Sequence, residues 1–365
     1  MKPGMPDANV IIMQRNKSRE IKIGHVGVGG NNPVRLQSMT NTPTRDAQAT
    51  LNQINALALA GCELVRVAVP DFEDAAALFE IKKHCPIPLI ADIHFDHRLA
   101  LRAMDAGVDG LRINPGNISD TSKVARIVDQ AKKHRIPIRI GVNSGSVEKK
   151  LLKKYNGPAP EAMVESALGH IRLLEEQNFD LIKISIKSSS VLDTIAAYQL
   201  MARQRDYPLH IGITEAGTPL RGAAKSGVGM GILLYQGLGD TLRVSLTGDP
   251  LQEMTVAWEI LRALNLRHRG PEIISCPTCG RTEIDLPALA LAVEDRLRNV
   301  EKVFTVAVMG CVVNGPGEAR EADIGIAGGR DCGIIFRKGR TIRKVRGQDL
   351  VPEFMAELED FLRLT

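Results

Sequence analysis

The sequence predicts an α/β protein in which a (β/α)8 barrel of the TIM type precedes a smaller α/β module. Short β-rich runs alternate with helical patterns over roughly 220 residues, which is about the size of a closed barrel. Aliphatic residues stand at alternate positions in these runs, and a short linker, Arg267-His-Arg-Gly270, follows the last helical pattern. We therefore expect the barrel over residues 1–266 and the second domain over residues 271–365.

The barrel elements follow one another in order. Residues 20–34 resemble a small hairpin at the barrel's entrance. The expected strands are Arg35–Thr40, Leu64–Pro70, Pro88–Phe95, Gly110–Asn114, Ile136–Asn143, Leu181–Lys187, Leu209–Glu215 and Thr241–Leu246. Amphipathic stretches typical of helices lie between most of them, at Thr50–Ala60, Asp71–His84, Lys123–Arg135, Ala159–Gln177 and Val191–Gln204, and Leu251–Leu266 is the last. An open doubly wound sheet is the alternative, but its glycine fingerprint is missing because Gly27-Val-Gly-Gly30 precedes a strand.

The second domain reads as a compact α/β module without repeats. A Cys-x-x-Cys turn opens it. The expected elements that follow are a helix at Leu286–Arg298, strands at Val303–Met309, Asp323–Ala327, Gly333–Arg337 and Thr341–Val345, and a closing helix at Leu350–Leu362.

The polar face of the barrel strands carries an excess of cations. Because side chains alternate between faces, the aliphatic set should pack on the helices and the polar set should point into the barrel. Six cations fall on that inner face: Arg66, Arg112, Arg139, Lys183, Lys187 and Arg243. Asp92 and Glu215 cannot neutralise all of them, and a buried unpaired cation costs several kcal/mol. The pattern predicts a polyanionic ligand, best a diphosphate, at the C-terminal mouth, where His94 could donate a hydrogen bond or shuttle a proton.

Three cysteines of the second domain have the spacing of metal ligands. Cys276 and Cys279 form the pair in Ser275-Cys-Pro-Thr-Cys-Gly280, and Cys311 opens a Gly/Pro-rich loop that ends at Glu318. The spacing leaves open whether Glu318 or Cys332 is a fourth ligand, and whether the metal is zinc or iron. A thioredoxin-like pair would leave Cys311 without a role.

The remaining cysteines read as core thiols. Cys332 stands at the head of an apolar run, and Cys62 and Cys85 flank the start of strand-like runs. A disulfide framework is not expected in a chain of this length without a secretion signal.

Composition excludes several classes of protein. The formal net charge is +5 and aromatic residues make up 4% of the chain, so a binder of single-stranded nucleic acid, which stacks bases on rings, is not favoured. No apolar run approaches the ~18 residues needed to span a bilayer. The N-terminus lacks the hydrophobic segment of a signal peptide, and we expect a cytoplasmic protein.

Taken together, an anion-binding barrel and a module with Cys-Pro-Thr-Cys-Gly and Gly-Cys-Val-Val-Asn-Gly-Pro-Gly-Glu resemble the 4-hydroxy-3-methylbut-2-enyl diphosphate synthase family. These are iron–sulfur enzymes of the non-mevalonate isoprenoid pathway, here in the bacterial two-domain arrangement. The resemblance implies a 4Fe–4S cluster on Cys276, Cys279, Cys311 and Glu318. It also implies substrate-binding roles for eight residues: Arg66, His94, Arg112, Arg139, Asn143, Lys187, Arg243 and Ser245.

The chemistry implied by the resemblance is the reductive ring opening of 2-C-methyl-D-erythritol 2,4-cyclodiphosphate. Glu318 would be a ligand that substrate oxygen can displace, because a carboxylate is harder than a thiolate, and Glu215 would deliver a proton. Without a nicotinamide or flavin motif, the electrons should come from flavodoxin or ferredoxin. The family also implies a homodimer in which each cluster module serves the partner's barrel. The roles of Lys183 and Cys332 stay open.

Two other classes fit parts of the pattern. A radical enzyme that uses S-adenosylmethionine would carry a Cys-x-x-x-Cys-x-x-Cys triplet in its barrel, and the sequence has none. A phosphate-binding barrel with a structural zinc ribbon is the non-catalytic alternative.

Overall fold

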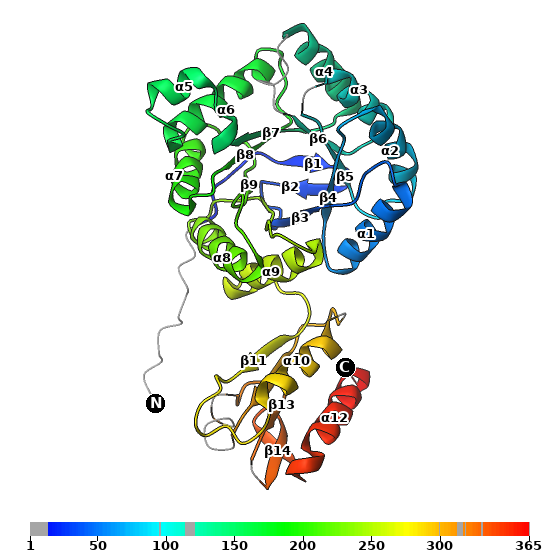
Figure 1. Cartoon of the computed structure of the whole chain (residues 1–365), viewed down its shortest axis with the longest axis vertical. Helices are drawn as coiled ribbons and strands as arrows, with labels where there is room; N and C mark the ends of the chain where they lie inside the picture. The colour runs from blue at the N-terminus through cyan, green and yellow to red at the C-terminus, as the bar shows by residue number, and fades with distance from the viewer. Residues whose placement is uncertain are drawn as a thin grey trace. The chain divides into compact units, whose positions relative to one another are not determined.

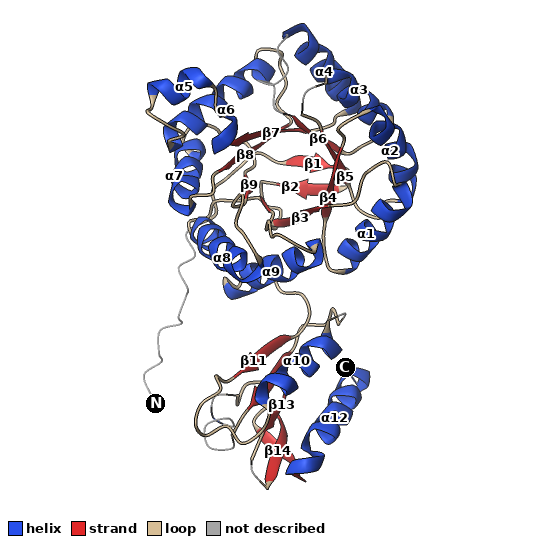
Figure 2. Ribbon diagram, in the orientation of Figure 1, coloured by secondary structure: helices blue, strands red, loops and turns tan. Residues whose placement is uncertain are grey.

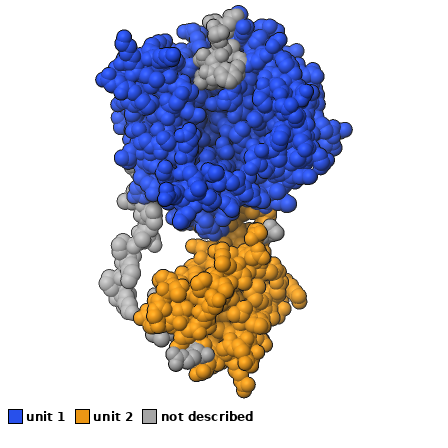
Figure 3. Space-filling view, in the orientation of Figure 1, with its two compact units in different colours: residues 1–267 blue, residues 268–365 orange. Residues whose placement is uncertain are grey.

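The computed structural model describes residues 14–364, except residues 95, 114–120, 299, 312–316, 318 and 330. The chain divides into two compact units, Met1–Arg267 and His268–Thr365 (Figure 3). Separate clusters of buried hydrophobic side chains lie in the two units, so each unit has a core of its own.

The first unit is a barrel of parallel strands. Their order is β8-β7-β6-β5-β4-β3-β10-β9, and a parallel bridge between Ile184 and Leu209 joins β8 to β9, which closes the ring (Figure 1). The predicted TIM-type barrel is therefore confirmed. The strands are β3 (Arg35–Met39), β4 (Leu64–Ala68), β5 (Leu89–Asp92), β6 (Gly110–Ile113), β7 (Ile138–Asn143), β8 (Ile182–Lys187), β9 (His210–Ile211) and β10 (Thr241–Leu242).

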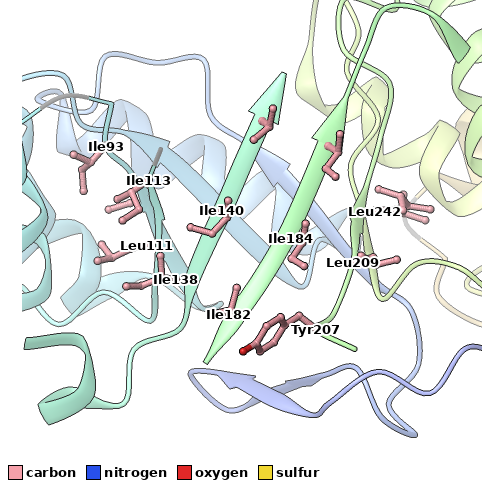
Figure 4. Packing of buried hydrophobic residues seen from close by; sticks show 14 of the residues in the cluster. Ile93, Leu111, Ile113, Ile138, Ile140, Ile182, Ile184, Tyr207, Leu209 and Leu242 are labelled. Atoms are coloured by element: carbon pink, nitrogen blue, oxygen red, sulfur yellow. The ribbon is translucent and has the colours of Figure 1, made fainter. Parts of the chain in front are cut away.

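Helices surround the barrel (Figure 2). They are α1 (Ala47–Leu59), α2 (Phe72–His84), α3 (His97–Asp105), α4 (Thr121–His134), α5 (Lys149–Lys154), α6 (Pro160–Glu175), α7 (Val191–Ala202), α8 (Pro219–Tyr235) and α9 (Pro250–Ala263). The aliphatic residues at alternate strand positions, such as Ile138, Ile140, Ile182 and Ile184, are fully buried in the cluster that includes the helices' apolar faces (Figure 4). The alternate residues of each strand are left to fill the barrel interior, as the sequence pattern predicts.

The expected hairpin lies at the end of the barrel opposite the mouth. Its strands, β1 (Ile21–Ile23) and β2 (Val26–Val28), pack with Leu64 and Ile90 in a small apolar cluster. Leu64 is the first residue of β4 and Ile90 the second of β5, so the hairpin covers the N-terminal ends of the strands. The expectation that it stands at the entrance is wrong, because its apolar face fills the barrel floor.

Strands β9 and β10 are shorter than the sequence suggests. Glu215 has a φ of 52°, a left-handed conformation that no strand can include. Beyond β10, the backbone N–H of Leu246 donates to the Glu253 carboxylate at 3.1 Å instead of to a neighbouring strand. The ends of these two runs therefore become loops at the barrel mouth.

Tyr198 supports the barrel where the ladder is shortest. Its buried hydroxyl accepts a hydrogen bond from the Ile186 N–H at 3.1 Å and donates one to the His210 carbonyl. One α7 side chain thus ties β8 to β9.

The second unit is a five-stranded sheet with the order β11-β12-β13-β14-β15. Its strands are β11 (Glu272–Ser275), β12 (Thr305–Met309), β13 (Ile324–Ala327), β14 (Cys332–Arg337) and β15 (Arg340–Arg346), and helices α10 (Leu286–Leu297) and α12 (Leu350–Leu364) supply part of its core. The sequence reading missed β11, a short edge strand that buries little apolar surface. No helix among the described residues is long and apolar enough to cross a membrane.

Candidate active site

Strand register places four charged residues in one row across the barrel interior. Asp92 pairs with Arg112, Arg112 with Arg139, and Arg139 with Lys183, on the consecutive strands β5 to β8. All four are at most 8% exposed. The row therefore holds three cations and one carboxylate inside the barrel.

Asp92 is the counter-charge of two arginines. Its carboxylate lies 2.9 Å from Arg112 Nη1 and 3.4 Å from Arg66 Nε. Burial alone would raise the pKa of Asp92, but Arg66, a hydrogen bond from His94, Arg112 and Arg139 outweigh it and hold the pKa well below its usual range. Burial lowers the pKa of Arg66 to about 10 against the attraction of Asp92. The carboxylate consequently stays ionised and fixes both guanidinium groups.

Asp92→Asn should lower the free energy of unfolding by about 1.5–3 kcal/mol at neutral pH, because it leaves two buried cations without their charged acceptor. Since the folded-state pKa of Asp92 is depressed, its stabilisation is complete above the unfolded pKa of about 4 and is lost as the pH falls towards the folded value. Urea unfolding from pH 7 to pH 2.5 measures this. If the difference in free energy of unfolding between wild type and Asp92→Asn does not decrease below pH 4, Asp92 is not the stabilising counter-charge of these arginines.

Lys187 and Arg243 stand beyond that row, towards the mouth. A Cβ atom on Gly212 would come within 2.7 Å of Lys187 Nζ, so the glycine lets this lysine reach across from β8 to the chain after β9. Burial, Arg139 and Arg243 all lower the pKa of Lys187. Arg243 Nη2 lies 3.4 Å from Glu253 Oε1.

Glu253 is a site residue that the sequence analysis missed. It is 4% exposed on α9, and its carboxylate also accepts hydrogen bonds from Ser38 Oγ at 3.2 Å and from the Leu246 N–H at 3.1 Å. The signal was present: Glu253 falls on the buried face of α9 with Met254 and Ala257. A carboxylate at a core-facing helix position is expected to have a charged or polar partner.

The interior has more positive than negative groups. The predicted cations lie in one unit: Arg66, Arg112, Arg139, Lys183, Lys187 and Arg243. Among the described residues, two carboxylates form ion pairs with members of this set, those of Asp92 and Glu253. Buried donor atoms of Arg112, Arg139 and Arg243 have no hydrogen-bond partner among the described residues. Such groups are costly unless an anion accepts from them. The barrel is thus suited to a ligand with several negative charges.

The other predicted barrel residues lie at the strand ends. Asn143 is paired with Lys187 across β7 and β8, and Asn143 and Ser245 are both half-buried. His94, whose side chain is 53% exposed, places Nε2 at 2.9 Å from Arg112 Nη1 and 3.4 Å from Asp92. Glu215 is exposed after β9 and makes no hydrogen bond or ion pair with a described residue. The structure therefore brings His94 to the cations but not Glu215.

Two of the three predicted ligand cysteines are close together in the second unit. Cys276 follows β11 and Cys311 follows the parallel neighbour β12, so both stand where these strands end. Cys276 Sγ accepts a hydrogen bond from the Gly310 N–H at 3.2 Å. Cys279 is exposed in the turn after Cys276, where its N–H donates to Thr282 Oγ1 at 3.1 Å.

The fourth predicted ligand, Glu318, lies outside the described residues. Within the described part of the chain, no three His, Cys, Asp or Glu side chains are close enough to hold a metal ion. The donor set nevertheless fits an iron–sulfur cluster, because soft thiolates beside a backbone N–H that donates to sulfur are its usual surroundings.

The other cysteines differ in exposure. Cys62 is buried, donates to the Leu64 carbonyl at 3.1 Å, and has a pKa that burial raises to about 12. Cys85 is half-buried and donates to the Ile87 carbonyl. The expectation of a buried thiol at Cys332 is wrong: Cys332 is exposed, because it begins β14 before the buried part of that strand.

Comparison with known proteins gives whole-chain similarity. The family described as the GcpE TIM-barrel domain matches residues 18–258, and the GcpE protein C-terminal domain matches residues 272–360. The chain is 68% identical to a 4-hydroxy-3-methylbut-2-en-1-yl diphosphate synthase (flavodoxin) of Maridesulfovibrio salexigens, over 96% of this chain and 99% of the relative. The protein of the same name from Lawsonia intracellularis is 64% identical, over 94% of this chain and 96% of the relative.

Proposed function

Because the chain belongs to the GcpE family, we propose that it is an iron–sulfur oxidoreductase with the activity of its named relatives. It converts 2-C-methyl-D-erythritol 2,4-cyclodiphosphate into 4-hydroxy-3-methylbut-2-enyl diphosphate, an isoprenoid precursor, by reductive ring opening and loss of a hydroxyl group as water. The observation that carries the proposal is the barrel interior, where two carboxylates of the described residues form ion pairs with members of a set of six cations.

The barrel residues would bind and orient the substrate. Two phosphoryl groups match the forks of the arginines and the point charge of Lys187, and these cations hold the diphosphate as its ring opens. Asn143, Ser245 and His94, at the strand ends, would contact the remaining oxygens. The eight substrate-binding residues are then Arg66, His94, Arg112, Arg139, Asn143, Lys187, Arg243 and Ser245.

The second unit would supply electrons. Cys276, Cys279, Cys311 and Glu318 would hold a 4Fe–4S cluster, which delivers two electrons to the substrate when it is bound. Glu215 would hold the proton that the reaction consumes; its exposure after β9 leaves it free to turn towards a ligand. The relatives' names include flavodoxin, which supports flavodoxin or ferredoxin as the donor to this protein in the cytoplasm.

Anaerobic turnover tests the proposal. The purified protein, with its cluster reconstituted, should convert the cyclic diphosphate to the linear diphosphate only when a reduced flavodoxin is supplied, with two electrons consumed per product. Mass spectrometry identifies the product. Tight binding without conversion would favour the alternative, a phosphate-binding barrel with a structural zinc ribbon.

The chain leaves the barrel at the end opposite the mouth. Arg267, the last residue of the first unit, donates to the Val34 carbonyl at 2.8 Å and pairs with Glu63. These two residues immediately precede β3 and β4. We propose that the active unit is a homodimer in which each cluster domain completes the partner's barrel, because a substrate at the mouth must meet a domain tethered at the opposite end.

Complementation tests the shared site. A barrel-defective variant, Lys187→Ala, and a cluster-defective variant, Cys311→Ser, should each be inactive alone. After subunit exchange, about half the dimers are mixed and each has one intact site, so about a quarter of wild-type activity should return. A mixture that stays inactive, with exchange verified by mass spectrometry, would show that each site is formed within one chain.

A further inference from the structure

His210 is a buried titratable residue with no role in the function described above. It lies on β9 and is 0% exposed. Tyr198 donates to its carbonyl, and its ring Nδ1 lies 2.8 Å from Oγ1 of Thr241, its partner in β10. The ring is therefore held on one side by a hydroxyl.

The other ring nitrogen, Nε2, is buried and has no hydrogen-bond partner in the part of the chain that the structure describes. The charged groups that act most strongly on the ring are Lys187, Arg139, Lys183 and Arg66. Burial, followed by these cations, lowers the pKa of His210 well below its usual value, so the imidazole is neutral.

The surroundings select one tautomer. All four neighbouring charged groups are donors, and none of them can accept a hydrogen bond. A proton on Nε2 would add a further donor among them, whereas a proton on Nδ1 can be donated to Thr241 Oγ1. The Nδ1–H tautomer is favoured because it turns the Nε2 lone pair towards the cations.

Lys187 is the cation that acts most strongly on the His210 ring. Its ammonium lies against Gly212, two residues beyond His210 and on the same face of the chain. Arg139, Arg243 and Arg66 repel it more strongly than Glu253 attracts it, and it makes no ion pair with a described residue. A neutral acceptor beside it would favour its charged form.

We propose that His210, as the Nδ1–H tautomer, is a positioning residue whose Nε2 accepts a hydrogen bond from a water molecule that the Lys187 ammonium also binds. It thereby keeps Lys187 charged and directed towards the diphosphate. The inference rests on the proposed binding of a diphosphate in this barrel.

The probe is inorganic pyrophosphate. Its binding to the full-length protein is measured by isothermal titration calorimetry. His210→Leu should weaken its binding by about ten- to a hundred-fold, the range expected when a charged group loses one hydrogen bond. His210→Gln retains an acceptor and should restore most of the affinity. Tyr198→Phe is the matched control, because it loosens the same strand without touching the imidazole.

The pH profile separates positioning from a general structural role. Without its acceptor, Lys187 should lose its proton at lower pH, so the alkaline limit of pyrophosphate binding should move down in His210→Leu and stay in place in Tyr198→Phe. Equal losses of affinity in His210→Leu, His210→Gln and Tyr198→Phe, with unchanged alkaline limits, would overturn the proposal.

Nitrogen-15 NMR of wild-type protein labelled at histidine gives a test that does not depend on the folding of a variant. Comparison with folded His210→Gln assigns the His210 signals. The His210 shifts should be those of the Nδ1–H tautomer from pH 6 to pH 9. The Nε2–H tautomer or an imidazolium would refute the inference. Pyrophosphate binding and the NMR shifts do not depend on turnover. If both have the expected values but the protein does not convert the cyclic diphosphate, the proposed function is wrong and the inference about His210 stands.

Discussion

Cys276→Ser, Cys279→Ser and Cys311→Ser variants should each lose the visible absorbance of an iron–sulfur cluster together with all activity. Each replacement removes one of three thiolates, and a serine hydroxyl is a poor ligand for iron of this kind. Absorbance at visible wavelengths and the turnover assay, both under anaerobic conditions, measure the two losses.

Cys85→Ser is the matched control. Cys85 is half-buried and its thiol donates to the Ile87 carbonyl at 3.0 Å, a bond that a serine hydroxyl can make. It should leave absorbance and activity unchanged. Glu318→Gln should retain much of the iron but lose turnover. Loss of the cluster in Cys332→Ser, with full activity in Glu318→Gln, would show that Cys332 is the fourth ligand.

Lys187→Ala should weaken substrate binding by roughly 2–5 kcal/mol, because it removes one charge partner of a desolvated diphosphate. Folding should survive and can become more favourable, since Arg139, Arg243 and Arg66 lose a repelling neighbour. Calorimetry with the cyclic diphosphate and thermal unfolding measure the two effects. Lys225→Ala, on the exposed side of α8, is the control and should change neither.

Arg243→Ala should weaken binding to a similar extent but also destabilise the fold. It leaves the buried carboxylate of Glu253 without its cation, although Ser38 Oγ and the Leu246 N–H still donate to it. A large loss of thermal stability with unchanged substrate affinity in both variants would show that these cations are structural.

The direction of the inward-facing cations could be predicted from the sequence because it depends on one local rule. Side chains on a strand alternate, so Lys183 and Lys187 must share a face once Ile182, Ile184 and Ile186 pack on the helices. Their lateral neighbours could not be predicted, because register depends on contacts between strands that are distant in sequence. The pairing of Asp92 with Arg112, and of Arg139 with Lys183, is known only from the structure.

The residues that were missed or misjudged depend on tertiary packing. Glu253 reaches the site from a helix, so no strand pattern includes it. His210 stood in a predicted strand, but its environment arises only when β8 and β9 close the barrel. The apolar run that follows Cys332 predicts a buried thiol, but Cys332 is the first residue of its strand and faces solvent. The periodicity of a sequence predicts which face of a strand or helix a side chain occupies. The residues that the side chain contacts depend on the assembled fold.

Metal and sulfide analysis of the anaerobically purified protein is the most direct test of the central claim, that the three cysteines hold an iron–sulfur cluster for chemistry on an anion in the barrel. We expect about four iron and four sulfide ions per chain in the wild-type protein and none in Cys311→Ser. The claim would be contradicted if the protein contained about one zinc ion per chain and no sulfide, and if this zinc remained bound after anaerobic reconstitution with iron.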